Sequence, residues 1–183
     1  MEKILITGTG RCGTTFLIKL FSFLDFNTGY NRNNYSLSIY SNCNSGMERS
    51  YKDNYNVLKS PLFIKDIKKI LEDTSITITN VIIPIRDLSM CAKSRVKHGL
   101  NSEGGLWEDT DELSQINFYQ NILSNYLVIS TKYDINTIFI DFDNMIHDKT
   151  YLFNKLKNIL DKQNIDFETF SRVYDEVSLS CKP

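Results

Sequence analysis

Apolar and polar positions follow one another along this chain in two alternating patterns. Short runs rich in β-branched residues, such as the one that begins at Lys3, are followed by stretches with apolar residues at helical spacing. The first of these stretches carries Phe16, Leu17, Leu20 and Phe21 on one face. The patterns predict strands at residues 3–7, 56–59, 80–85 and 137–141. They predict helices at residues 14–24, 63–73, 87–97, 112–131 and 150–162.

This alternation is typical of an α/β fold with a mainly parallel sheet, and we expect three layers with helices flanking the sheet. A length of 183 residues with 42% hydrophobic content suits a single domain over residues 1–183. The stretch between Asn27 and Asn56 is polar, rich in Asn, Ser and Tyr, and weakly periodic. A loop of that length within one domain is usually functional or disordered.

Charge and composition narrow the range of partners. The chain has 21 Lys and Arg against 22 Asp and Glu, so we expect no general nucleic-acid binding, and any basic site must be local. No apolar run approaches ~18 residues and no signal-like segment opens the chain, so we expect a cytoplasmic protein that does not bind membranes. The four cysteines are dispersed, which favours reduced thiols, and we expect no metal.

The segment from Lys3 to Leu20 has the outline of a phosphate-binding loop: an apolar strand, a glycine-rich loop and an apolar helix pattern. Such a loop turns backbone N–H groups toward one point at a helix N-terminus, where the helix dipole favours an anion. Gly8 and Gly13 fit G-x-x-x-x-G, but Thr14 stands where ATP- and GTP-binding loops carry Lys. The one cation within the loop is Arg11.

Several segments resemble the sulfotransferases that use 3′-phosphoadenosine 5′-phosphosulfate (PAPS). Residues 11–15, RCGTT, are similar to the family's first loop. Arg86, at the end of a predicted strand, and Ser94, eight residues later, match the pair that in the family holds the 3′-phosphate. Weaker similarities lie at residues 57–61, which end in Lys-Ser-Pro, and at residues 138–145, which resemble the family's late strand.

The resemblance implies a P-loop NTPase-like sulfotransferase architecture with PAPS as co-substrate and 3′-phosphoadenosine 5′-phosphate (PAP) as product. It implies transfer of a sulfuryl group to a hydroxyl or amine of an unidentified small-molecule, glycan or peptide acceptor. Residues 27–56 would form a lid on the acceptor side. Arg11 and Lys59 would act as catalytic cations that neutralise growing charge. The implied co-substrate contacts are Arg11, Cys12, Gly13, Thr14, Thr15, Arg86 and Ser94.

The general base is where this chain departs from the family. Some relatives carry His at the position of Pro61, and others carry Glu in a segment that reads Asn-Arg-Asn-Asn here, at residues 31–34. Glu48, Asp53 and His98 remain as candidates for the base, and Glu48 is the preferred one because it lies shortly before Lys59 in the acceptor-side stretch.

Two other functions stay open on the sequence. A P-loop kinase for a small molecule shares the strand, loop and helix, although Thr14 in place of Lys opposes it. A non-catalytic protein that binds PAPS or PAP would explain the missing family base. Arg95 is predicted to lie at the surface or behind the residues that touch the ligand, and Trp107 is predicted to pack in the core.

Overall fold

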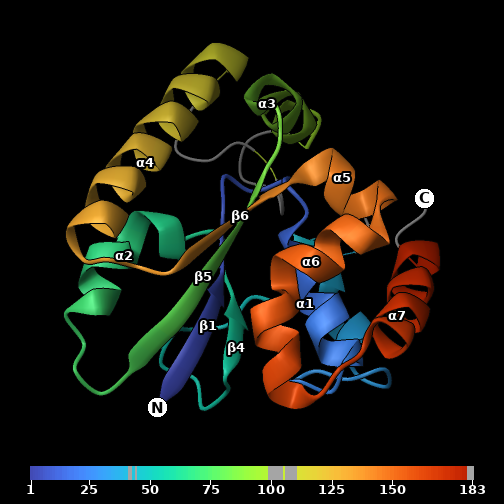
Figure 1. Cartoon of the computed structure of the whole chain (residues 1–183). Coiled ribbons are helices and arrows are strands. Elements are labelled where there is room, and N and C mark those ends of the chain that lie inside the picture. The colour runs from blue at the N-terminus through green and yellow to red at the C-terminus, as the bar shows by residue number, and fades with distance from the viewer. Residues whose placement is uncertain (41–42, 44, 99–104, 106–110, 181–183) are drawn as a thin grey trace.

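A computed structural model of the protein describes residues 1–40, 43, 45–98, 105 and 111–180. Its centre is a four-stranded sheet with the order β4-β1-β5-β6, in which every pairing is parallel (Figure 1). The four predicted strands are confirmed, with ends that differ by at most three residues. They are β1 (Glu2–Ile6), β4 (Val57–Lys59), β5 (Thr77–Ile85) and β6 (Thr137–Asp141).

Helices cover both faces of the sheet, so the predicted α/β class with a parallel sheet is confirmed (Figure 1). One face carries α1 (Thr14–Phe23), α5 (Phe142–His147), α6 (Lys149–Leu160) and α7 (Phe167–Ser180). The other face carries α2 (Phe63–Leu71), α3 (Leu88–Val96) and α4 (Glu112–Lys132).

Alternate residues of the central strands serve two separate cores. In β1, Leu5 packs with α2, α3 and α4, whereas Ile6 packs with α1 and the C-terminal helices. In β5, Val81 and Ile83 face the first of these cores and Ile82 faces the second. Because successive strand side chains point to opposite faces, a strand covered on both sides is apolar throughout. This explains why β1 and β5 read as continuous apolar runs.

The structure also contains elements that the sequence patterns did not predict. The helix α7 buries Phe170, Val173, Tyr174 and Val177, which lie at helical spacing. The short helix α5 follows β6 without a loop. The polar stretch at residues 27–56 contains a 3-10 helix and a hairpin whose two strands have two residues each. These are η1 (Tyr35–Ser38), β2 (Ile39–Tyr40) and β3 (Ser45–Gly46).

Parallel pairing brings the carboxyl ends of all four strands to one edge of the sheet. The glycine-rich loop follows β1 there, Lys59 ends β4, Arg86 follows β5 and Asp141 ends β6. The helix after β1 covers one face and the helix after β4 covers the other, so the two connections diverge. Ligands of open α/β sheets bind at such a point. None of the helices in the described ranges is long and apolar enough to cross a membrane.

Candidate functional site

The loop between β1 and α1 depends on left-handed backbone at three positions. Gly10 and Gly13 have φ of 73° and 92°, and a Cβ on Gly10 would lie 2.1 Å from Nη2 of Arg95. The left-handed conformation favours glycine at position 10, and a side chain there would displace the guanidinium of Arg95. Arg11 has φ of 58° without being glycine, a conformation that costs on the order of 1–3 kcal/mol and is concentrated at functional sites.

The N-terminus of α1 is open toward the loop. The N-cap is Gly13, which has no side chain to accept from the first turn, and the first intrahelical bond joins Leu17 N to Gly13 O at 3.2 Å. The N–H groups of Thr14, Thr15 and Phe16 precede that bond and have no partner within the helix. Together with the helix dipole, these N–H groups form a site that suits a phosphate or sulfate.

Three of the predicted site residues meet around the loop. Arg11 Nε donates to Ser94 Oγ at 2.9 Å, and its Nη1 donates to the carbonyl of Cys43. Arg86 Nη1 donates to the carbonyl of Arg11 at 3.0 Å, and the guanidinium carbon lies 4.4 Å from the ring centroid of Phe142. Residues from the ends of β1 and β5 and from α3 are thereby joined into one cluster.

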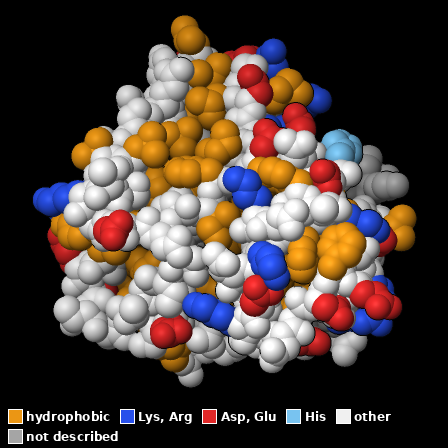
Figure 2. Space-filling model, viewed as in Figure 1, with side chains coloured by type: hydrophobic (Ala, Val, Ile, Leu, Met, Phe, Trp, Pro, Cys, Tyr) orange, Lys and Arg blue, Asp and Glu red, His pale blue; other side chains and the backbone are white. Residues whose placement is uncertain are grey.

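The positive charge of this cluster is concentrated. Burial lowers the pKa of Arg11, and the neighbouring guanidiniums of Arg95 and Arg86 lower it further. Within the described part of the chain, neither Arg11 nor Arg86 forms an ion pair with a carboxylate. By contrast, acidic and basic side chains are interspersed on the face shown in Figure 2.

Two places were predicted for Arg95, at the surface or behind the residues that touch the ligand, and the surface is wrong because Arg95 is only 8% exposed. It lines the cavity and donates from Nη1 to the carbonyl of Gly105. The guanidinium packs against Gly10, where the missing side chain leaves room for it. Arg95 therefore adds a third positive charge close to the loop.

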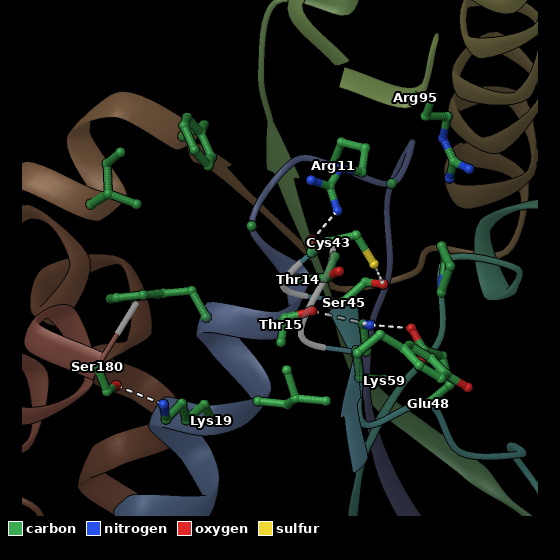
Figure 3. Close-up of a pocket in the computed structure, with 18 of the residues that line it drawn as sticks. Arg11, Thr14, Thr15, Lys19, Cys43, Ser45, Glu48, Lys59, Arg95 and Ser180 are labelled. Atoms are coloured by element: carbon green, nitrogen blue, oxygen red, sulfur yellow. Dashed lines mark hydrogen bonds and ion pairs between the residues drawn. The ribbon is translucent and has the colours of Figure 1, made fainter. Parts of the chain in front are cut away.

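A cavity of about 720 Å³ opens beside the N-terminus of α1 (Figure 3). The loop and first turn of α1 form one end, the segment around the β2–β3 hairpin forms one wall, and α5 and α7 form the opposite wall. Arg86 and Ser94 do not belong to its lining; they contact the loop from the α3 side. Its polar lining includes Arg11, Thr14, Thr15, Lys19, Ser45, Glu48, Lys59, Arg95, His147 and Ser180.

Lys59 and Glu48, predicted as catalytic cation and base, form an ion pair in this cavity (Figure 3). Lys59 is 2% exposed, and its Nζ also donates to Gly46 O at 2.8 Å and approaches Thr15 Oγ1 at 3.4 Å. Burial lowers the pKa of Lys59, while the Glu48 carboxylate opposes that shift. The side chain of Glu48 is 39% exposed, so solvent and ligands can reach its carboxylate.

The other two base candidates do not line the cavity. The carbonyl of Asp53 accepts from Lys3 Nζ at 2.6 Å, and Lys3 lies at the amino end of β1, opposite to the glycine-rich loop. His98 follows α3 and lies outside the cavity lining. Glu48 is thus the one candidate of the three that the fold brings to the cavity. The thiol of Cys12 is fully buried, so this residue offers a ligand only its backbone.

Sequence reasoning missed Lys19 and His147, both of which line the cavity. Lys19 follows Thr15 by four residues and therefore lies on the same helix face, one turn further on. A lysine inside a helix that is otherwise apolar at this point was the available signal. His147 had no such signal, because it lies in α5, which was not predicted. Trp107 lies outside the described residues.

No group of three or more His, Cys, Asp and Glu side chains that could hold a metal ion occurs in the described ranges. Comparisons of the chain with protein-family models, with curated proteins and with solved structures found no match.

Proposed function

We propose that this protein is a PAPS-dependent sulfotransferase with a P-loop NTPase-like architecture. The observation that carries the proposal is the cluster of Arg11, Arg86 and Ser94 beside the open N-terminus of α1. The guanidiniums of Arg11 and Arg86 pair with no carboxylate among the described residues, and they repel one another at close range. A ligand with several negative charges would offset that repulsion. PAPS carries such charges on both the 3′ and the 5′ side of its ribose.

Two parts of the cluster bind two different groups of the co-substrate. The 5′-phosphosulfate lies against the N–H groups of Thr14 and Thr15, with Arg11 beside it. Arg86 and Ser94 hold the 3′-phosphate on the α3 side of the loop, outside the main cavity. Thr14 replaces the lysine that would reach the γ-phosphate of ATP, which disfavours the kinase alternative.

Sulfuryl transfer joins the acceptor oxygen or nitrogen to sulfur and breaks the bond between sulfur and the bridging oxygen of the phosphosulfate, which leaves on PAP. Lys59 stabilises the negative charge that grows on that oxygen. Glu48 accepts the proton that the acceptor loses as it attacks. Their ion pair keeps both groups together, and the greater exposure of Glu48 leaves its carboxylate open to the acceptor.

A ligand panel tests this proposal. The thermal unfolding midpoint of the full chain is measured with PAP, adenosine 5′-phosphosulfate, ADP and ATP, each with and without magnesium. We expect PAP to give the largest shift and magnesium to have no effect on it; a ligand at 100 times its Kd adds about 2.7 kcal/mol to the free energy of unfolding. A larger shift with magnesium-ATP would overturn the proposal and support the kinase.

Transfer of labelled sulfate from PAPS into a broad acceptor mixture is the second part of the test. Tight PAP binding without transfer to any acceptor would support the non-catalytic binding protein. The missing family base at Pro61 is the observation that keeps this alternative in the experiment.

A further inference from the structure

The far end of the cavity holds a buried lysine. Lys19 lies in the middle of α1, a helix with nine of its ten residues buried, and is itself only 2% exposed. Its side chain lines the same cavity as Lys59 and Glu48, at the end away from them (Figure 3). Thr15 lies at the end of α1 next to Lys59. Lys19 is four residues later, which corresponds to about 6 Å along the helix axis.

Lys19 has few partners for a buried ammonium. Its Nζ donates to Ser180 Oγ at 2.6 Å and lies 4.1 Å from the ring centroid of Tyr35. No carboxylate pairs with it in the part of the chain that the structure describes. An ammonium has three hydrogens to donate, and a buried charge without a counter-charge is unfavourable. An anion from outside the chain would supply the missing counter-charge.

A second observation at the same end points to a ligand. The hydroxyl of Ser178, which also belongs to the cavity lining, is buried and forms no hydrogen bond of normal geometry among the described residues. Its neighbour is the hydroxyl of Tyr174, which itself donates to Met145 O at 3.0 Å. The hydroxyl of Ser180 donates to Val177 O at 2.6 Å and accepts from Lys19, so Lys19 and Ser178 are the groups that offer donors to an anion. A single cation matches a singly charged carboxylate, whereas the guanidiniums that suit a phosphate lie at the opposite end of the cavity.

The walls between the two ends are apolar. Phe16 and Phe142 contribute rings, and Ile39 and Ile146 contribute aliphatic side chains. A bound molecule would therefore present an apolar body to this part of the cavity, with polar groups at its two ends. The 3′ side of the nucleotide lies toward Arg86, outside the lining, which leaves this region to the acceptor.

We propose that the acceptor is an amphipathic carboxylate. Its hydroxyl or amine lies beside Lys59 and Glu48, its body lies between the apolar walls, and its carboxylate is bound by Lys19 with the hydroxyl of Ser178. This assignment rests on the proposed sulfuryl transfer for the identity of the acceptor. The carboxylate site itself is a statement about binding and is tested without turnover.

The probes are 3-(4-hydroxyphenyl)propanoate and its neutral analogue 3-(4-hydroxyphenyl)propanamide. Both have a hydroxyl at one end of an aromatic ring, and they differ only in the charge at the other end. Each is titrated by calorimetry into the full chain, with and without saturating PAP. We expect the wild-type protein to bind the carboxylate at least tenfold more tightly than the amide. Equal affinity for the two probes, or no binding of either, would overturn the proposal.

Two variants identify the residue responsible. Lys19→Met and Lys19→Gln both remove the charge, and we expect each to bind the carboxylate no more tightly than the amide while affinity for the amide changes less than twofold. Lys157→Met removes an exposed lysine of α6 and serves as the control. A carboxylate preference that survives in a folded Lys19 variant would instead leave Lys19 as a structural partner of the C-terminal turn of α7.

The outcomes separate this inference from the proposed function. PAP binding is measured independently in the ligand panel, so a protein that binds PAP but treats the two probes alike retains its sulfotransferase assignment and loses the carboxylate acceptor. A protein that prefers the carboxylate but does not bind PAP retains the Lys19 site and loses the sulfotransferase assignment. The comparison of the two probes on wild-type protein decides the matter even where a variant does not fold.

Discussion

The ion pair between Lys59 and Glu48 should matter much more for turnover than for stability. Lys59→Met removes a buried ammonium that donates to Gly46 O and pairs with Glu48. Loss of the donor to that carbonyl costs about 1–3 kcal/mol. Removal of a buried charge recovers a desolvation penalty of several kcal/mol, in the opposite direction. The two contributions offset one another, so we expect the free energy of unfolding to stay within about 2 kcal/mol of wild type.

Glu48→Gln is the matching change on the other side of the pair. The amide keeps an oxygen that can accept from Lys59 but cannot take a proton from the acceptor. Because the Glu48 side chain is 39% exposed, solvent screens the lost attraction, which is worth about 0.2–1 kcal/mol. The loss of a general base lowers turnover on the order of 10²–10⁴-fold, and loss of a charge that stabilises the transition state lowers it on the order of 10²–10³-fold.

The assay follows labelled sulfate from PAPS into the acceptor mixture, with PAP affinity and urea unfolding measured on the same preparations. Lys157→Met and Asp161→Asn remove the partners of an exposed pair, 2.8 Å apart, between α6 and the residue that follows it, and should leave turnover unchanged. We expect PAP affinity to change far less than turnover in both cavity variants, because only interactions that strengthen in the transition state accelerate the step. Turnover within threefold of wild type in Lys59→Met would refute the catalytic assignment of this pair.

Two further predictions follow from the charged groups. Arg86→Ala should weaken PAP binding by about 10–150-fold, the equivalent of 1.5–3 kcal/mol for a charge-assisted contact, and should leave AMP affinity unchanged. Equal losses for PAP and AMP in calorimetry would mark Arg86 as a support for the loop, and Arg172→Ala, at an exposed site, is the control. Burial lowers the pKa of Lys59 in the folded protein below its unfolded value of about 10.4. At a pH between these two pKa values, the unfolded chain binds more protons at Lys59 than the folded protein does. The free energy of unfolding of the wild type, relative to that of Lys59→Met, should therefore rise as pH increases toward 10. Urea unfolding of both proteins from pH 7 to 10 measures this difference. A difference that stays constant or falls would contradict the prediction.

Regular spacing of apolar residues made most of the helices and strands predictable. The elements that were not predicted include a hairpin too short to show a period and a helix that does show one. The strands and five helices carry apolar residues at a period that only one type of element satisfies. The hairpin at Ile39–Tyr40 and Ser45–Gly46 has two residues in each strand, too few for any period to register. The helix at Phe167–Ser180 did carry a signal, because Phe170, Val173 and Val177 recur at helical spacing. This helix was therefore predictable from the sequence.

The candidate site was predictable where chemistry lies next to a strand end. Arg11, Lys59 and Arg86 follow or end parallel strands, so the topology brings them to one edge whatever the loops do. Glu48 was chosen for its proximity to Lys59 in sequence, and the hairpin segment folds back so that the two side chains meet. The sequence could not decide between a surface and a buried position for Arg95, because the room that Gly10 leaves for its guanidinium depends on the loop conformation.

Among the described residues, four Lys and Arg side chains line the cavity and a fifth, Arg86, contacts the loop from outside it. Arg11, Arg86 and Arg95 gather at the glycine-rich loop, Lys59 stands at the first turn of α1, and Lys19 stands one turn further along. Guanidiniums form two-pronged contacts with phosphates, whereas an ammonium acts as a point charge. A polyanionic nucleotide is therefore best accommodated at the loop, and a singly charged group at Lys19. Lys59 lies between them with the carboxylate of Glu48 at its side, where a group moving from the nucleotide to an acceptor would have to pass.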